Sequence, residues 1–315
     1  DAEVIQAIED LVPLAPLHNP ANLAGILAAQ AQMPGVPQIA VFDTAFHQTM
    51  PAEAYTYAVP HEWVEGLDVR SYGFHGTSHL YVSRRAATLL DRPLSELRLI
   101  TCHVGNGVSV SAVQHGRSVA NSMGLTPLEG AIMGTRAGDL DPGLIPYVKA
   151  QTGLTYEEIF SALNKQSGMV ALSGLSDLRD VEEAHLRGDE RCTAALQAYA
   201  YRLKKYVGAY AAVLGGVDAI VFTAGVGENS PIIRELVLTG MEYLGVHLDA
   251  PANQATWRGL EGPISTSDSP VKVLVVPTNE ERIIIEDSVA LLDGRSPAEP
   301  SFRYSFEFAG LAAAQ

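Results

Sequence analysis

Short apolar runs alternate along the chain with longer segments in which apolar residues recur every three or four positions. Residues 38–43, 217–224 and 271–277 are rich in β-branched side chains, and each run ends at polar or glycine residues, as buried strands do. Strand patterns that alternate with helix patterns are typical of a parallel or mixed sheet. The sequence therefore predicts an α/β fold.

Two more apolar runs, residues 97–103 and 109–113, flank Gly105, Asn106 and Gly107 and predict a hairpin with a glycine-rich turn. Glycine lets a phosphate approach the backbone closely. On this motif alone, an ordinary hairpin turn is the simpler interpretation. His103 shifts the balance toward anion binding, because a histidine at a strand end can donate a hydrogen bond to an anion.

The helical pattern predicts helices over residues 75–90, 155–166, most of 181–214 with a break near 187–189, and 232–244. Ser230 followed by proline is the start signal of the last of these helices. Residues 225–229 lie between a predicted strand and that helix, so their backbone N–H groups are placed to face an anion or a nucleotide. The alternating aromatic residues of the tail, 302–308, predict either a strand or a disordered end.

Composition narrows the class of protein. The chain has 315 residues, of which 47% are apolar and 18% charged, enough for about two domains. Its formal charge of −15 repels nucleic acid and anionic membranes, so neither is an expected partner. Two cysteines provide no disulfide framework and no zinc spacing, and no apolar stretch is long enough to span a membrane. We expect a cytoplasmic protein.

His75 and His79 are four residues apart, so they would share one face of a helix that begins at His75. Zinc binding is not favoured, since the glutamate of the zinc-protease motif is missing and neither cysteine is near in sequence. We interpret residues 73–78 as a strand-to-helix turn that presents His75 to a ligand. The alternative is that both histidines have satisfied packing roles.

Arg136 lies in a small-residue loop between Gly134 and Gly138. Its planar guanidinium matches a carboxylate or the equatorial oxygens of a phosphoryl group in transfer. A salt bridge to Asp139 or Asp141, close in sequence, explains the arginine equally well.

Asp43 ends one apolar run and Glu280 follows another. Carboxylates at strand ends commonly hold Mg²⁺ beside the phosphates of a nucleotide. For Glu280 alone, a place in the first turn of a helix is an explanation without metal.

Seven motifs, in this order along the chain, resemble the acetokinase family. They lie at residues 16–20, 41–49, 72–79, 103–107, 134–142, 223–230 and 277–281. The resemblance implies the fold shared by actin, sugar kinases and chaperone ATPases, which is ribonuclease H-like, with two α/β domains and a nucleotide in the cleft between them. It assigns residues 1–43 and 282–315 to an incomplete first domain, and residues 44–281 to a second, nucleotide-binding and dimerisation domain.

The family implies a role for each matching residue. His75 and Arg136 resemble residues that stabilise the transferring phosphoryl group, with Asp43 in the same cleft. Glu280 resembles a carboxylate linked to Mg²⁺. The residues that resemble nucleotide-binding positions are His103, Gly105, Asn106, Gly107, Asp177, Leu178, Arg179, Gly225, Val226, Gly227, Glu228 and Asn229. Those that resemble the carboxylate site and its apolar pocket are His18, Leu17, Phe74 and Pro127.

The resemblance implies direct, in-line and reversible phosphoryl transfer from ATP to acetate, giving ADP and acetyl phosphate, by a homodimer. Transfer to propionate is the nearest alternative, and a non-catalytic remnant that binds a nucleotide or a partner is another. The chain departs from the family pattern in two places. It begins about a hundred residues into the pattern, without the phosphate-binding opening segment, and the loop at residues 174–180 is one residue shorter than usual.

Overall fold

The computed structural model describes residues 1–12, 18–299 and 302–308. The chain forms two compact units, Asp1–Val41 and Phe42–Gln315, here called the N-terminal unit and the main unit. The N-terminal unit contains α1 (Ala2–Asp10) and α2 (Asn19–Gln32), which contact each other. Asp1 caps α1 by accepting a hydrogen bond from the N–H of Val4, so the first helix has a local start signal.

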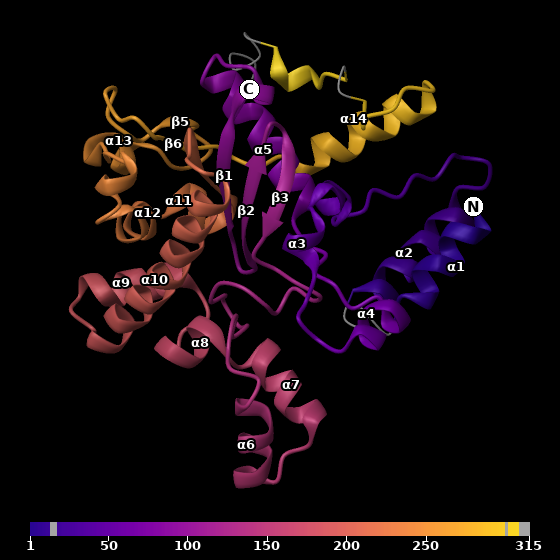
Figure 1. Ribbon diagram of the computed structural model, residues 1–315, viewed down its shortest axis with the longest axis horizontal. Coiled ribbons are helices and arrows are strands. Elements are labelled where there is room, and N and C mark those ends of the chain that lie inside the picture. The colour runs from indigo at the N-terminus through magenta and orange to yellow at the C-terminus, as the bar shows by residue number, and fades with distance from the viewer. Residues whose placement is uncertain (13–17, 300–301, 309–315) are drawn as a thin grey trace. The chain divides into compact units, whose positions relative to one another are not determined.

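The main unit is built on a six-stranded sheet in the order β3-β2-β1-β4-β6-β5 (Figure 1). The strands are β1 (Arg98–Val104), β2 (Val108–Gln114), β3 (Arg117–Asn121), β4 (Ala219–Thr223), β5 (Gly262–Pro263) and β6 (Lys272–Val275). β4 lies parallel to both β1 and β6, and the other pairs are antiparallel. The sheet is therefore mixed, as predicted.

Side chains alternate between the two faces of this sheet. On one face, Ile100 of β1 and Phe222 of β4 join a core that includes apolar residues of α10 and α12. On the other face, Leu99 and Val221 pack with Val82 of α5. Both faces are buried because helices cover each of them, which explains why β4 and β6 are nearly continuous apolar runs.

Helices make up most of the remaining structure. The other α-helices are α3 (Ala52–Tyr55), α4 (His61–Leu67), α5 (Gly76–Leu89), α6 (Leu144–Thr152), α7 (Tyr156–Lys165), α8 (Gly168–Ser173), α9 (Leu178–Leu186), α10 (Glu190–Val213), α11 (Ala224–Asn229), α12 (Pro231–Leu238), α13 (Ala250–Ala255) and α14 (Glu280–Leu292). The 3₁₀ helices are η1 (Ala45–Thr49), η2 (Leu94–Glu96), η3 (Glu242–Leu244) and η4 (Ser305–Glu307).

Most of the predicted elements are confirmed. The hairpin is β1 and β2, and the predicted helices 75–90 and 155–166 are α5 and α7. The break expected near residues 187–189 separates α9 from α10, where Asp189 caps the second helix. The helix predicted over residues 232–244 is too long: α12 ends at Leu238, and Gly240 follows in the left-handed conformation with φ 78°.

The strand predicted over residues 38–43 is wrong. These residues have no strand partner in the part of the chain that the structure describes, and the Phe42 side chain is 48% exposed. A strand needs a neighbour for its N–H and C=O groups. An apolar sequence indicates that a segment can be a strand, but it does not supply that neighbour.

The described tail is neither a strand nor disordered. Tyr304 and Phe306 are buried, and the Phe306 ring lies 4.4 Å, centroid to centroid, from the ring of Tyr81 in α5. The aromatic pattern therefore reflects packing on a helix. Residues 309–315 lie outside the described residues. Helix α14 also packs on α5, and the predicted grouping of residues 282–315 with residues 1–43 stays a prediction.

Candidate active site

Helix α5 begins at a turn that fixes the backbone of His75. The residue has φ 56°, in the left-handed region, and its N–H donates to Oδ2 of Asp43 at 2.7 Å. The N–H of Gly76 donates to the carbonyl oxygen of Asp43 at 2.8 Å. A Cβ atom at Gly76 would collide with that oxygen, so the turn requires glycine. Asp43 therefore holds the conformation that presents His75.

The imidazole of His75 is fixed on several sides. Its Nδ1 lies 2.9 Å from Oγ of Ser109, and its ring stacks on His103 with centroids 3.9 Å apart. The Cε1–Nε2 edge of the ring faces Gly107. A Cβ atom there would lie 3.4 Å from Nε2 of His75 and 2.9 Å from Nη2 of Arg136. Glycine at position 107 thus leaves the space in which His75 and Arg136 converge.

Below this turn, a seam of buried polar side chains lies between α5 and the sheet. It contains Thr101 and His103 of β1, Ser109 and Ser111 of β2, and Ser78 and His79 of α5. Residues two apart on a strand point to the same face, which is why these strand positions all meet α5. Both ring nitrogens of His79 are engaged by hydroxyl groups, so the ring offers none to a metal.

Burial keeps the histidines of the site neutral. It lowers the pKa of His75 to about 4, with the positive charge of Arg136 as the second cause. Burial also lowers the pKa of His79 and of His103 well below the ordinary value. At neutral pH each of these rings is therefore uncharged, with one N–H donor and one acceptor nitrogen.

Arg136 is held by a backbone oxygen and has no ion-pair partner among the described residues. Its Nη1 donates to the carbonyl of Pro127 at 2.6 Å. The two carboxylates close in sequence are engaged elsewhere: Asp139 accepts from the Tyr206 hydroxyl at 2.7 Å, and Asp141 from a backbone N–H of its own loop. The guanidinium keeps donors for a ligand, because it has five N–H groups.

Glu280 stands in the first turn of α14, where Asn279 provides the cap. Its Oε2 accepts a hydrogen bond from the Thr77 hydroxyl at 2.7 Å. Burial raises the pKa of Glu280, and the negative charge of Asp43 raises it further. The interpretation of Glu280 as a residue of a first helical turn is therefore correct. Its carboxylate also lies near the carboxylate of Asp43 and contacts Thr77 at the start of α5.

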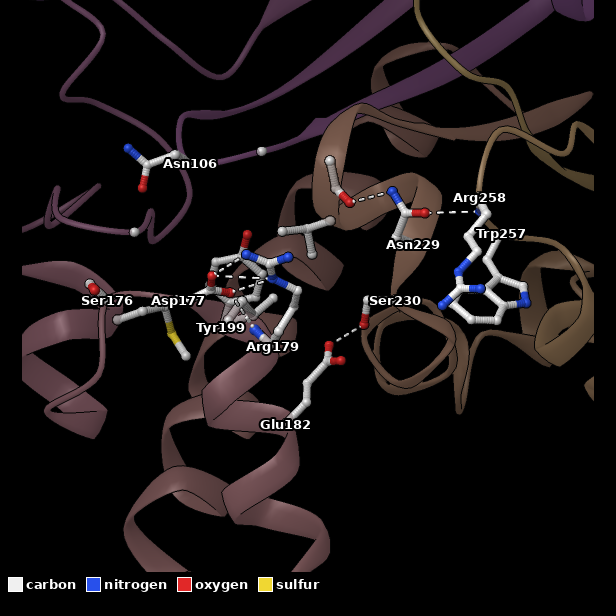
Figure 2. A pocket seen from close by; sticks show the side chains of 16 residues that line it. Asn106, Ser176, Asp177, Arg179, Glu182, Tyr199, Asn229, Ser230, Trp257 and Arg258 are labelled. Atoms are coloured by element: carbon white, nitrogen blue, oxygen red, sulfur yellow. Dashed lines mark hydrogen bonds and ion pairs between the residues drawn. The ribbon is translucent and has the colours of Figure 1, made fainter.

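A cavity of about 820 Å³ opens at the tip of the hairpin (Figure 2). Its lining residues are Gly105, Asn106, Gly134, Met169, Ser176, Asp177, Leu178, Arg179, Glu182, Tyr199, Gly225, Val226, Asn229, Ser230, Trp257 and Arg258. The volume is typical of small-molecule sites, which range over roughly 300–1,000 Å³. The cavity brings together three segments that were predicted to bind a nucleotide and that lie far apart in sequence.

Of the predicted nucleotide-binding residues, His103, Gly107, Gly227 and Glu228 do not line this cavity. Gly107 lies between His75 and Arg136. Glu228 instead accepts a hydrogen bond from the N–H of Thr278 at 3.1 Å, which ties α11 to the loop before Glu280. Residues 225–229, predicted to lie between a strand and a helix, form the short helix α11 with Ala224, whose φ is 65°.

The walls of the cavity are joined by a buried arginine. Arg234 is fully buried, and it donates to the carbonyl oxygens of Gly227, Glu228 and Thr256, and to the carbonyl and side-chain oxygens of Asn253. These bonds connect α11 with the segment that leads into Trp257 and Arg258. Ser230 donates to Glu182 of α9, which joins the third wall (Figure 2).

Sequence reasoning missed Glu182, Tyr199, Trp257 and Arg258. Tyr199 lies inside α10 and reads as an ordinary core residue. Trp257 and Arg258 lie in an irregular segment, where the guanidinium carbon stands 3.9 Å from the centroid of the indole ring. A tryptophan next to an arginine in a polar segment was the available signal.

The predicted carboxylate-site residues are only partly described. Leu17 lies outside the described residues. His18 precedes α2 in the N-terminal unit, where its carbonyl oxygen accepts from the N–H of Asn22. In the main unit, the Phe74 carbonyl lies 2.9 Å from Nε2 of His47. The side chain of Phe74 packs on the core, and Pro127 contacts Arg136 through its carbonyl oxygen.

A model of the Acetokinase family matches residues 1–286. The chain belongs to the acetokinase family. It is 59% identical over 295 residues to the acetate kinase of Thermotoga maritima, in a match that spans 93% of this chain and 73% of that protein. It is 56% identical to the acetate kinase of Halothermothrix orenii, with coverage of 92% and 73%.

Solved structures of the family have the same fold. The match to Porphyromonas gingivalis acetate kinase has a TM-score of 0.88 at 49% identity and covers 93% of this chain and 73% of that one. A propionate kinase from Francisella tularensis matches with a TM-score of 0.84 at 40% identity, over 89% and 71%. The predicted family, fold class and enzyme class, a phosphotransferase with a carboxyl acceptor, are confirmed. ATP or ADP and a small carboxylate are the ligands of this family.

Within residues 1–12, 18–299 and 302–308, no helix is both long enough and apolar enough to cross a membrane.

Arg234→Met is expected to raise the KM for ATP on the order of tenfold, because losing bonds that position two cavity walls costs about 1–2 kcal/mol of binding. The kcat should change less. Steady-state kinetics with varied ATP measures both, after circular dichroism has shown the variant to be folded. Asn253→Ala, which removes one bond of the same group, should give a smaller change in the same direction.

Arg85→Met is the matched control. Arg85 is also buried, but it pairs with Glu261 and contacts the tail, and neither Arg85 nor Glu261 lines the cavity. A KM for ATP raised equally by both arginine variants would mean that Arg234 acts through general stability and not through the cavity walls.

Proposed function

We propose that this chain is an acetate kinase, which transfers the γ-phosphoryl group of ATP to acetate in a direct, in-line and reversible reaction. The supporting observation is the convergence of His75 and Arg136 on Gly107, at the tip of the hairpin that also borders the nucleotide-sized cavity. A nucleotide whose base and ribose occupy the cavity would direct its phosphates along Gly105 and Asn106 toward these two side chains.

Arg136 stabilises the transition state by charge and shape. In phosphoryl transfer, negative charge spreads over three equatorial oxygens, and a planar guanidinium can donate to two of them at once. Because Arg136 is partly withdrawn from water, its charge acts more strongly than it would at the surface. His75 contributes a neutral hydrogen bond beside Arg136, and the stacked ring of His103 supports its orientation.

Glu280 is the proposed residue for Mg²⁺. Its carboxylate, the nearby Asp43 carboxylate and the Thr77 hydroxyl form a set of oxygen donors that suits this ion. No group of three or more histidine, cysteine, aspartate or glutamate residues that could hold a metal occurs in the described part of the chain. Such a site fits an ion that takes its remaining ligands from water and phosphate oxygens. When bound, the ion would neutralise phosphate charge.

The acceptor would bind beside Arg136, with Phe74 and Pro127 as the apolar contact for its methyl group. A role of His18 and Leu17 in binding the carboxylate is proposed on the resemblance alone. The protein is proposed to work in the cytoplasm, which suits two buried thiols, Cys102 and Cys192, that form no disulfide. Nucleic acid is not a proposed partner, because the formal charge of the protein, −15, repels the phosphate backbone.

Phosphorus NMR of the purified protein with MgATP and acetate is expected to show an acyl-phosphate signal and ADP. A parallel sample with propionate is expected to react more slowly at equal concentration. A faster reaction with propionate would replace acetate kinase by propionate kinase. No acyl phosphate with either acid, in protein shown to be folded, would support the non-catalytic alternative.

Arg136→Ala is expected to lower kcat by roughly a hundredfold or more, as loss of one transition-state donor does elsewhere, while the dissociation constant for ADP stays within a few fold. Coupled kinetics and titration calorimetry measure the two quantities. Arg187→Ala, which removes an exposed i,i+4 ion pair with Glu183, is the control and should leave both unchanged. A near-normal kcat for Arg136→Ala would remove this arginine from the transition state.

A homodimer is proposed through the α9 and α10 region. Tyr201 is 66% exposed and Val213 59% exposed on α10, which is apolar surface that a second copy could cover. Sedimentation velocity at micromolar concentration is expected to give a dimer, and a monomer there would contradict the proposal.

A further inference from the structure

A continuous chain of buried hydrogen bonds leads away from His75 into the main unit. Nδ1 of His75 lies 2.9 Å from Oγ of Ser109, and the same oxygen lies 2.7 Å from Nε2 of His79. Nδ1 of His79 lies 2.7 Å from Oγ1 of Thr101, whose hydroxyl is also 3.5 Å from the carbonyl oxygen of Ser111. Ser109, His79 and Thr101 are fully buried, so water does not replace these partners.

The Ser109 hydroxyl couples the two histidines. It has a single hydrogen and bridges two ring nitrogens, so it can donate to only one of them, and the other nitrogen must donate to it. Each neutral imidazole has a single N–H. Both rings have hydroxyl partners and no carboxylate partner among the described residues, His79 is fully buried, and Arg136 brings positive charge beside His75, so both rings are neutral. Two arrangements of the protons therefore remain for the series of hydrogen bonds from His75 to Thr101.

In the first arrangement, His75 donates from Nδ1 to Ser109, and Ser109 donates to Nε2 of His79. His79 then donates from Nδ1 to Thr101. This leaves Nε2 of His75, the nitrogen that faces Gly107 and Arg136, with a lone pair and no hydrogen. A lone pair at that position would repel the oxygens of a phosphoryl group.

In the second arrangement, every bond of the chain is reversed. Thr101 donates to His79, His79 donates from Nε2 to Ser109, and Ser109 donates to Nδ1 of His75. The hydrogen of His75 is then on Nε2. The only contact given up is the one from Thr101 to the Ser111 carbonyl, which at 3.5 Å is at the outer limit of a hydrogen bond.

We propose that Ser109, His79 and Thr101 are positioning residues that hold His75 as the tautomer with its hydrogen on Nε2, so that the ring presents an N–H donor beside Arg136. The inference extends the proposed phosphoryl transfer, because it states why a neutral histidine can bind an anion here. Thr101 ends the chain as the donor, and the strand positions of Thr101 and Ser109 keep both hydroxyls on the face below α5. Metal ligation by His79 is excluded in this arrangement, since both of its nitrogens are used.

The test is a long-range ¹H–¹⁵N correlation spectrum of the ligand-free protein labelled with ¹⁵N-histidine, at neutral pH. His75→Gln and His79→Gln identify the signals of the two rings by their loss. Both rings are expected to show a protonated Nε2 and an unprotonated Nδ1. Hydrogen on Nδ1 of His75, or a mixture of the two forms, would overturn the proposal. Because the spectrum needs no turnover, its outcome is independent of whether the protein phosphorylates acetate.

Ser109→Ala tests whether the hydrogen bonds from His75 to Thr101 matter for catalysis. It is expected to lower kcat on the order of tenfold, with little change in the KM for ATP, because the His75 ring loses the partner that orients it. The Nδ1 signal of His75 should shift as its hydrogen bond is lost, and Ser109→Thr, which keeps the hydroxyl, should restore both the signal and kcat.

Ser118→Ala is the matched control, since it removes another buried serine–histidine bond, to Nδ1 of His47 at 2.7 Å, without touching His75. It should leave the His75 signals in place. An unchanged kcat in folded Ser109→Ala, or an equal shift of His75 signals in Ser118→Ala, would overturn the positioning role of Ser109.

Discussion

The hydrogen bond from the backbone N–H of His75 to the Asp43 carboxylate is the constraint on which the rest of the site depends. A histidine in the left-handed conformation is strained by roughly 1–2 kcal/mol, and it persists only where neighbouring groups hold it. Asp43 supplies both a carboxylate oxygen to His75 and a carbonyl oxygen to Gly76. These two bonds therefore determine where α5 begins and where the imidazole of His75 points.

The polar seam below α5 is a second consequence of that start. A buried hydroxyl or imidazole destabilises the fold by about 1–3 kcal/mol when it has no partner, so such a group is tolerated only inside a complete network. Ser109 and Thr101 complete it because strand alternation puts them on the face that α5 covers. The sheet carries apolar core on both faces and leaves this one strip polar, directly beneath the proposed phosphoryl site.

The overall charge of the protein and the local charge at the proposed site have opposite signs. The protein as a whole is strongly acidic, so a nucleotide and a carboxylate gain nothing from its overall charge. Attraction must come from nearby donors, and the structure places Arg136 where its two nearby aspartates do not neutralise it. Arg234, by contrast, donates its hydrogen bonds to carbonyl oxygens and connects the walls of the cavity. The fully buried Arg234 and the half-buried Arg136 thus differ in their tasks: Arg234 holds the backbone, and Arg136 faces the proposed phosphoryl site.

The sequence by itself determined the family, the α/β class, the hairpin around residues 105–107 and the helices α5, α7, α9 and α10, because these depend on local signals such as strand period, caps and glycine turns. It also indicated His75 and Arg136, since both lie among small residues in turns.

Only the tertiary structure decided which distant segments share a cavity, because residues such as Tyr199 and Trp257 come to it from a core helix and an irregular loop. The same holds for residues 38–43, which have no strand partner among the described residues, because a partner is a property of the fold and not of the segment. The partners of Ser109, which restrict the proton positions on two histidines, likewise exist only once α5 has packed on the sheet.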